Sequence, residues 1–156
     1  TLSTRNSFRR IRPHFWAGAF NAWGYDNREA AIRVSRGKTG ATRFELKAAD
    51  ASANPYLALS TMLAAGLDGI ENKLELPAET TIDPALLSET EQKVNHVYAL
   101  PTSLGEALEA LQKNKVLLDA LGSERVKAYL AVKKMEWEAL KDVTLEDEVK
   151  MLAERY

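Results

Sequence analysis

Cysteine is absent from the sequence, which excludes both a disulfide framework and a metal site built on thiolates. Long apolar runs are also missing. The longest uncharged stretch of a predicted helix, residues 54–67, is too short to span a bilayer. The first residues are polar and basic, without the apolar core of a secretory signal. We therefore expect a cytoplasmic protein that does not associate with a membrane.

The overall composition is that of a globular protein. Hydrophobic residues make up 46% of the chain and charged residues 28%, a balance that disordered proteins do not have. A length of 156 residues suits one domain or a large part of one. The chain starts at Thr1 inside a basic segment, and we interpret it as a piece of a longer protein.

The charge is divided unevenly along the chain. Residues 1–47 contain ten Lys or Arg against three Asp or Glu, a net charge of +7. The other 109 residues contain 11 bases and 19 acids, a net charge of −8. All but two of the ten bases are arginine, whose planar guanidinium group makes multidentate contacts with carboxylates and phosphates. This division indicates an anion-binding region beside a solvated scaffold.

The first third of the chain predicts strands and the remainder helices. Three strands are predicted, over residues 19–23, 30–34 and 42–48, with turns at 24–27 and 35–40. Asn54 is a good N-cap, and Pro55 suits the first position of a helix. Apolar residues surround much of this helix as far as Ile70, which favours a helix buried in a larger body.

The segment after this helix is predicted to be irregular, apart from a short helix that Pro84 opens. Ser103 and Glu106 have the spacing of a capping box at the start of another helix. Gly122 predicts the end of a helix, and Ser123 the cap of a last helix with an apolar stripe and a charged, solvated face.

The third predicted strand alternates charged and apolar residues. Arg43, Glu45 and Lys47 point to one face, and Phe44 and Leu46 to the other. One interpretation is an exposed strand with cross-strand ion pairs. The other is a carboxylate that binds a divalent cation, between cations that bind phosphate or a substrate carboxylate. One glutamate cannot complete a metal site, so further ligands must come from elsewhere in the molecule.

Other motifs taken alone are weak. Residues 6–13 are compatible with a basic arm for nucleic acid, but the acidic remainder of the chain argues against that function. No zinc-finger, P-loop or dinucleotide fingerprint is present. His14 and His96 have no nucleophile or metal-ligand partner at a suggestive spacing, and we interpret both as structural.

Four stretches taken together resemble a known family. They are "NSFRRIRP", "AWGYDNREAAIRV", "TRFELKAADASANPYLALSTMLAAGLDGIENKL" and "SLGEALEAL". Their order is similar to that in the C-terminal part of glutamine synthetases, most strongly over residues 6–74. The resemblance implies an α+β fold, mostly helical with a few antiparallel strands. It also implies a strand-rich active-site segment over residues 1–50 and a helical segment over 51–156, with the family's N-terminal β-grasp domain and the rest of its catalytic barrel upstream.

The resemblance assigns nucleotide and metal contacts to four residues of the basic region. Glu45 matches a glutamate that binds Mg²⁺ or Mn²⁺. Arg43 matches an arginine of the nucleotide site. Arg28 and Arg33 match the arginines that contact the phosphates of ATP and the phosphoryl group in transfer. Charge neutralisation of this kind suits the activation of a carboxylate as an acyl phosphate.

The substrate contacts include two departures from the family. Arg10 and Arg28 match arginines that bind substrate, whereas Lys47 stands where most members have an arginine that holds the substrate glutamate. The family's flap reads roughly "PGYEAP", but "PHFWAG" here puts Trp16 at the position of a catalytic glutamate. Trp16 cannot attract ammonium by charge or take its proton, although it can stack on a larger or less polar amine. Both departures resemble the glutamine-synthetase-like branch.

We therefore expect an ATP-dependent carboxylate–amine ligase that acts through a γ-glutamyl phosphate. Its substrates would be a glutamate-type acid and ammonia or an amine, and the full-length protein would form a ring-type homo-oligomer. The 156-residue chain alone is expected to be inactive. The alternative is a non-catalytic scaffold of the same family.

Overall fold

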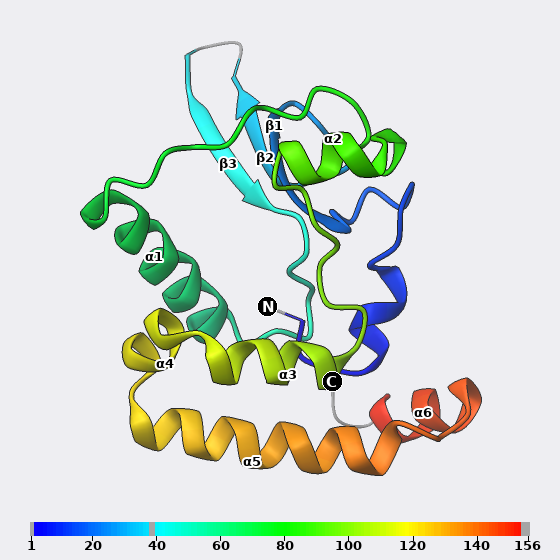
Figure 1. Ribbon diagram of the computed structural model, residues 1–156. Helices are drawn as coiled ribbons and strands as arrows, with labels where there is room; N and C mark the ends of the chain where they lie inside the picture. The colour runs from blue at the N-terminus through cyan, green and yellow to red at the C-terminus, as the bar shows by residue number, and fades with distance from the viewer. Residues whose placement is uncertain (1, 38–39, 154–156) are drawn as a thin grey trace. The chain divides into compact units, whose positions relative to one another are not determined.

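The structure, a computed structural model, describes residues 2–37 and 40–153. Within them it contains six α-helices, two 3-10 helices and one three-stranded sheet (Figure 1). The predicted α+β class is confirmed. Among the described residues, no helix is both long and apolar enough to cross a membrane.

The chain forms two compact units, each made of segments that are separated in the sequence. The sheet unit consists of Arg9–Ala49 and Glu75–Leu100. The helical unit consists of Thr1–Phe8, Asp50–Leu74 and Pro101–Tyr156. All seven residues with a predicted role in the site belong to the sheet unit.

The sheet has the order β1-β2-β3, with strands Phe20–Tyr25, Ala30–Arg36 and Thr42–Leu46. β2 and β3 pair antiparallel, in agreement with the prediction, whereas β1 and β2 pair parallel. The side chain of Asn27, in the short connection between them, donates to the carbonyls of Thr80 and Ile82 at 2.6 and 2.9 Å. The connection is therefore bonded to the later segment around residues 80–82 and does not form the tight turn of a hairpin. The first residue of β2 consequently pairs with the first residue of β1.

The edge of β1 is completed by residues that lie far along the chain. Thr80 donates its N–H to the Trp23 carbonyl, and Asn21 donates to the Tyr98 carbonyl, both at 2.9 Å. A small apolar cluster lies beside these contacts, formed by Ala22, Ala30 and Val97 with Phe20 and Leu87 packed against it. The later segment is thus part of the sheet unit and fixes β1.

This later segment is more regular than the sequence predicts. The expected short helix at Pro84 is present as η2, Pro84–Leu86. The following helix, α2 (Glu89–Val94), was predicted as irregular structure. A reciprocal capping box between Ser88 and Glu91 stabilises the start of α2.

The helical unit contains most of the remaining elements. Its helices are α1 (Pro55–Glu71), α3 (Leu104–Lys113), α4 (Lys115–Leu121), α5 (Ser123–Leu140) and α6 (Leu145–Leu152), and η1 (Asn6–Arg10) begins within it. Phe8, Leu104 and Leu108 form its buried cluster. Trp137 of α5 packs so closely on α3 that a Cβ on Gly105 would lie 2.9 Å from its ring. Glycine at this position therefore permits the contact between α3 and α5.

The helix ends show which local signals were read correctly. The Asn54 side chain caps α1, and Gly122 ends α4 with φ +78°. The Ser103 hydroxyl accepts the N–H of Glu106 at 3.1 Å, which is one half of the predicted capping box, whereas the Glu106 carboxylate accepts the N–H of Thr102 instead of that of Ser103. Ser123 does not cap α5 as predicted, because Gly122 occupies the cap position without a side-chain hydrogen bond. Helix α6, which Thr144 caps, was not predicted.

Helix α1 is less buried than its apolar sequence predicts. None of its residues is buried among the described residues, although it contacts α4. Leu59, Leu63 and Leu67 are 52–56% exposed, and Ile70 is 75% exposed. Within the described residues α1 is therefore not buried, and its burial in a larger body stays a prediction.

Candidate functional site

The charged face of β3 lies beside a charged residue of β2. Arg33 and Glu45 are opposite each other in the antiparallel pair, so their side chains share one face of the sheet. Arg33 Nη1 lies 3.4 Å from Glu45 Oε2, and Arg43 Nη2 lies 3.4 Å from Glu45 Oε1. The structure thus holds the Glu45 carboxylate between two guanidinium groups.

A second carboxylate extends this arrangement. Asp26 Oδ1 lies 4.0 Å from Arg33 Nη2, and Asp26 Oδ2 lies 3.7 Å from Arg36 Nε. Five side chains of alternating sign therefore follow one another, and we call them the charged row: Arg36, Asp26, Arg33, Glu45 and Arg43. Asp26 and Arg36 were not predicted as site residues, because both lie in segments that were predicted as turns, 24–27 and 35–40.

The contacts of the charged row are weak enough to be exchanged for those of a ligand. The Glu45 and Asp26 side chains are 31% and 49% exposed, and partly exposed ion pairs contribute about 1 kcal/mol or less. Arg33 Nε is buried and has no hydrogen-bond partner among the described residues. The row can therefore offer carboxylate oxygens to a cation and guanidinium groups to an anion.

Arg10 has a different environment. Its Nη2 donates to the carbonyls of Lys47, Ala48 and Ala49 at 3.2, 2.8 and 2.5 Å. Arg10 therefore holds the backbone just after β3, where Lys47 begins to leave the sheet. The structure brings Arg10 and Lys47 together through this backbone contact, and the substrate-binding roles of both side chains remain predictions.

Trp16 and Arg28 form a third contact among the predicted residues. The Arg28 guanidinium lies 5.4 Å from the centre of the Trp16 ring, within the range of a cation–π interaction. Trp16 is 61% exposed, so its ring remains accessible. The structure thus places an exposed aromatic surface next to a cation.

The acidic groups alone are insufficient for a metal centre. Among residues 2–37 and 40–153, no group of three or more His, Cys, Asp or Glu is placed to hold a metal ion. Glu45 fits the requirement for one oxygen ligand of a hard cation, and further ligands are needed.

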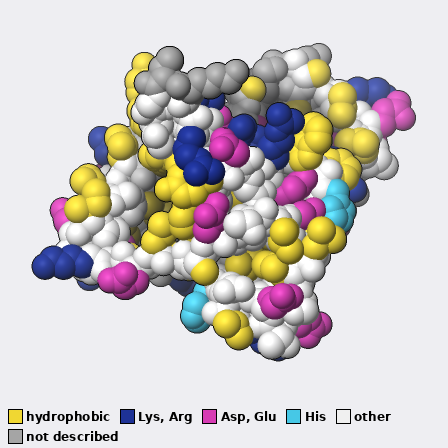
Figure 2. Space-filling model, turned by 90° about the horizontal axis from the view of Figure 1, so that it is seen from above, with side chains coloured by type: hydrophobic (Ala, Val, Ile, Leu, Met, Phe, Trp, Pro, Cys, Tyr) yellow, Lys and Arg dark blue, Asp and Glu magenta, His cyan; other side chains and the backbone are white. Residues whose placement is uncertain are grey.

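Figure 2 shows a face on which basic, acidic and apolar side chains are interspersed, rather than a uniformly basic surface of the kind that binds nucleic acid.

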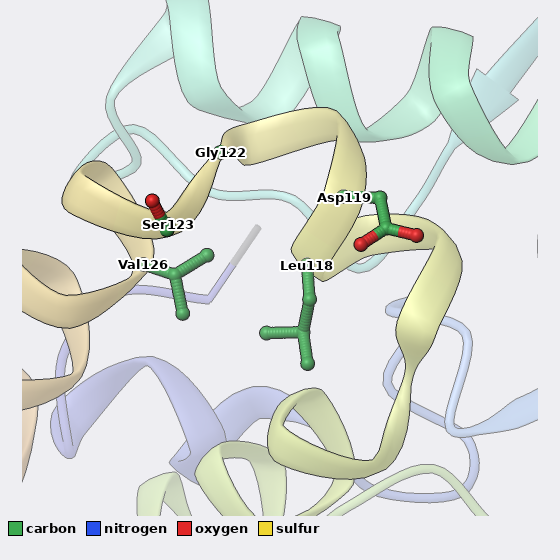
Figure 3. Close-up of a pocket in the computed structure, with 5 residues that line it drawn as sticks. All are labelled: Leu118, Asp119, Gly122, Ser123 and Val126. Atoms are coloured by element: carbon green, nitrogen blue, oxygen red, sulfur yellow. The ribbon is translucent and has the colours of Figure 1, made fainter.

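A hollow of about 300 Å³ lies elsewhere, at the junction of α4 and α5 (Figure 3). Its lining consists of Leu118, Asp119, Gly122, Ser123 and Val126. None of these residues is cationic, and none has a predicted role in the site.

Comparisons with known proteins identify the family to which the chain is similar. The family described as "Glutamine synthetase, catalytic domain" matches residues 1–152. A "Gamma-glutamylpolyamine synthetase" of Streptomyces coelicolor is 44% identical over 128 residues, which cover 80% of this chain and 28% of the relative. A "Glutamine synthetase" of Methanococcus maripaludis is 38% identical over 152 residues, which cover 96% of this chain and 34% of the relative.

A solved structure, "Crystal structure of novel glutamine synthase homolog", gives the same result for the fold. It superposes with a TM-score of 0.75 at 30% sequence identity, covering 100% of this chain and 34% of the other. The chain thus spans about a third or less of the length of these relatives.

Proposed function

The chain belongs to the glutamine synthetase family, and from that premise we propose that it is part of an ATP-dependent carboxylate–amine ligase. The γ-carboxylate of a glutamate-type substrate would take the terminal phosphoryl group of ATP, releasing ADP. An amine nitrogen would then attack the acyl carbon, phosphate would leave, and the nitrogen would lose a proton. The names of the relatives support ligase chemistry, and the charged row supports the handling of phosphate and carboxylate groups.

Both steps bring negative charges together, so cations must neutralise them. Arg28, Arg33 and Arg43 are the residues of this chain that would contact the phosphates of ATP. Glu45 would supply one oxygen ligand to Mg²⁺ or Mn²⁺, together with residues outside this chain. The metal ion would polarise the phosphoryl oxygens. Occupation of the site requires Arg33 and Arg43 to turn from Glu45 toward the phosphates, which their weak pairing permits.

The proposed glutamate contacts involve Arg10 and Lys47. Lys47 would offer the substrate carboxylate a compact point charge in place of the two-pronged contact of an arginine. Arg10 would contribute to glutamate binding through its hydrogen bond to the backbone carbonyl of Lys47, at 3.2 Å. The two residues therefore form one local arrangement, in which Arg10 fixes the chain segment that carries Lys47.

The proposal extends to the amine. Trp16 presents an exposed ring that already accepts the Arg28 cation at 5.4 Å. Such a ring suits an alkylammonium group better than ammonia, because ammonia has no apolar part to stack. The γ-glutamylpolyamine synthetase relative supports the same substrate class by its name. We therefore assign the site to an amine that is larger than ammonia and carries a second cationic group.

The observation that carries the proposal is the position of Glu45 between Arg33 and Arg43. The experiment is Glu45→Gln in the full-length protein, which keeps the side-chain shape and removes the charge. Turnover is expected to fall at least about a hundredfold and Mn²⁺ binding to weaken, because a metal ligand contributes directly to the reaction. The free energy of unfolding should change by no more than about 1 kcal/mol, since the ion pairs are partly exposed.

A matched control is Glu146→Gln, which removes an exposed ion pair with Lys150 at 2.8 Å in the helical unit. This variant should keep parental turnover and metal binding. Near-parental turnover of Glu45→Gln at saturating metal would contradict the site assignment.

A non-catalytic scaffold is the second candidate, and two residues favour it. Trp16 replaces an acid of the family's flap, and Lys47 replaces an arginine, so turnover could have been lost while the fold was kept. A scaffold would bind ATP without amine-dependent phosphate release, whereas the ligase would do both. The 156-residue chain alone is expected to show no turnover in either case, because Glu45 is its one proposed metal ligand.

A further inference from the structure

The loop that carries Trp16 has an unusual backbone. We call residues 13–18 the Trp16 loop. His14, Trp16 and Gly18 have φ values of +65°, +53° and +70°. Glycine adopts this conformation readily, whereas it is unfavourable for residues with a Cβ, and tryptophan has no side chain that compensates for it. Contacts with the rest of the sheet unit must therefore hold the loop in this form.

The base of the Trp16 loop is fixed by close packing. A Cβ on Gly18 would lie 2.6 Å from the Cα of Ala31, so only glycine fits there. The upper part of the loop has two side-chain contacts. Arg28 lies over the Trp16 ring, and His14 Nδ1 lies 2.6 Å from Asp83 Oδ2.

Asp83 is well placed to hold a loop. Its other carboxylate oxygen, Oδ1, accepts the N–H of Ala85 at 2.9 Å and caps η2. Its side chain is only 15% exposed, and the adjacent Pro84 is fully buried. The preceding residue, Ile82, accepts a hydrogen bond from Asn27, the neighbour of Arg28 in the chain. Residues 82 and 83 therefore bond both to His14 of the Trp16 loop and to Asn27, the neighbour of Arg28.

We infer that His14 is a positioning residue, whose hydrogen bond to Asp83 holds the Trp16 loop so that the indole ring faces the amine. This inference rests on the proposed ligase function. His14 itself is 64% exposed in its side chain and need not touch any substrate. Its loss should therefore affect use of the amine while leaving ATP and glutamate binding unchanged.

The test compares His14→Asn with His14→Asp in the full-length protein. Asparagine and aspartate have the same shape and tolerate positive φ better than most residues, so backbone strain is matched. The Asn amide nitrogen is bonded to Cγ, as is His Nδ1, and can donate to Asp83. The Asp carboxylate instead repels Asp83. A third variant, Asp83→Ser, keeps a capping oxygen for Ala85 but is one atom too short to reach His14 as Asp83 does.

Two measurements are made on each variant. Hydrogen–deuterium exchange of the Trp16 loop reports on the contact itself, without requiring catalysis. Steady-state kinetics with ammonia and with an aliphatic diamine report on its consequence. We expect faster loop exchange in His14→Asp and Asp83→Ser, with KM for the diamine raised about tenfold and KM for ATP and glutamate unchanged. His14→Asn should remain within about twofold of the parent protein, since it retains a donor.

Equal loop exchange in His14→Asn and His14→Asp would overturn the inference. So would faster exchange with unchanged diamine KM, or a uniform loss for all three substrates with a lower unfolding temperature, which is the result of a purely structural role. If the parent protein forms no product with any amine, the proposed function fails instead. The exchange comparison then still decides whether the His14–Asp83 contact holds the Trp16 loop.

Discussion

Replacing Arg10 separates two roles for this residue, one in substrate binding and one in holding the backbone. Its Nη2 donates to three successive carbonyls, of Lys47, Ala48 and Ala49. A hydrogen bond from a charged donor contributes about 1.5–3 kcal/mol when buried. Arg10 is only partly buried, three of its contacts come from Nη2, and Nη1 adds a long contact of 3.4 Å to the Lys47 carbonyl, so we expect Arg10→Gln to lower the free energy of unfolding by about 2–3 kcal/mol in total.

The assay is urea unfolding of the full-length protein, followed by the KM for glutamate. Arg12→Gln is the control, because Arg12 is an exposed arginine two residues away that should change stability by less than about 0.5 kcal/mol. Arg10→Gln should raise the KM for glutamate as well, since Lys47 loses its fixed position. A higher KM with unchanged unfolding would refute the reasoning and make Arg10 a substrate contact alone.

Two further predictions concern the amine and the acid range. Trp16→Glu should shift the preference of the full-length enzyme toward ammonia, measured as product formation across amines at equal concentration; an unchanged ranking would exclude Trp16 from the amine site. Hydrogen bonds from the Ser88 hydroxyl and backbone N–H lower the pKa of Glu91 in the folded protein. The stabilisation of α2 by Glu91 is therefore fully present above the pKa of Glu91 in the unfolded state, and it is lost as the pH falls through the pKa in the folded state. The protection factors of amides 89–94, which correct the exchange rate for its intrinsic pH dependence, should therefore fall on acidification in the parent protein and change less in Glu91→Gln; identical pH profiles of the two proteins would contradict this.

Local sequence signals predicted the helix ends that depend on single residues. Asn54, Ser103 and Gly122 act as the sequence indicates, because caps and positive φ are properties of one or a few neighbouring residues. The parallel pairing of β1 and β2 was not predictable in this way, since it depends on hydrogen bonds from Asn27 to carbonyls more than fifty residues away. Helix α2 was missed because its six residues carry little apolar periodicity.

In the candidate site, too, local signals predicted only the contacts between residues that are close in the sequence. The contact of Glu45 with Arg43 follows from strand alternation, and its contact with Arg33 required the register of β2 against β3. The role of Asp26 depended on the parallel pair and could not be derived from a turn motif. His14 was interpreted as structural because no nucleophile or metal ligand lies at a suggestive spacing. Its partner Asp83 could not be predicted, since it lies 69 positions away.

We propose above that this chain is part of a ligase that joins glutamate to an amine larger than ammonia. The most direct measurement is product formation by the purified full-length protein with ATP, Mg²⁺ and glutamate, with ammonia or an aliphatic diamine as the second substrate. Mass spectrometry would identify the γ-glutamyl amide, and phosphate release would give the rate. We expect glutamate-dependent phosphate release with a higher kcat/KM for the diamine than for ammonia. Preference for ammonia over every amine would contradict the amine assignment, and ATP binding without amine-dependent phosphate release would contradict the ligase itself.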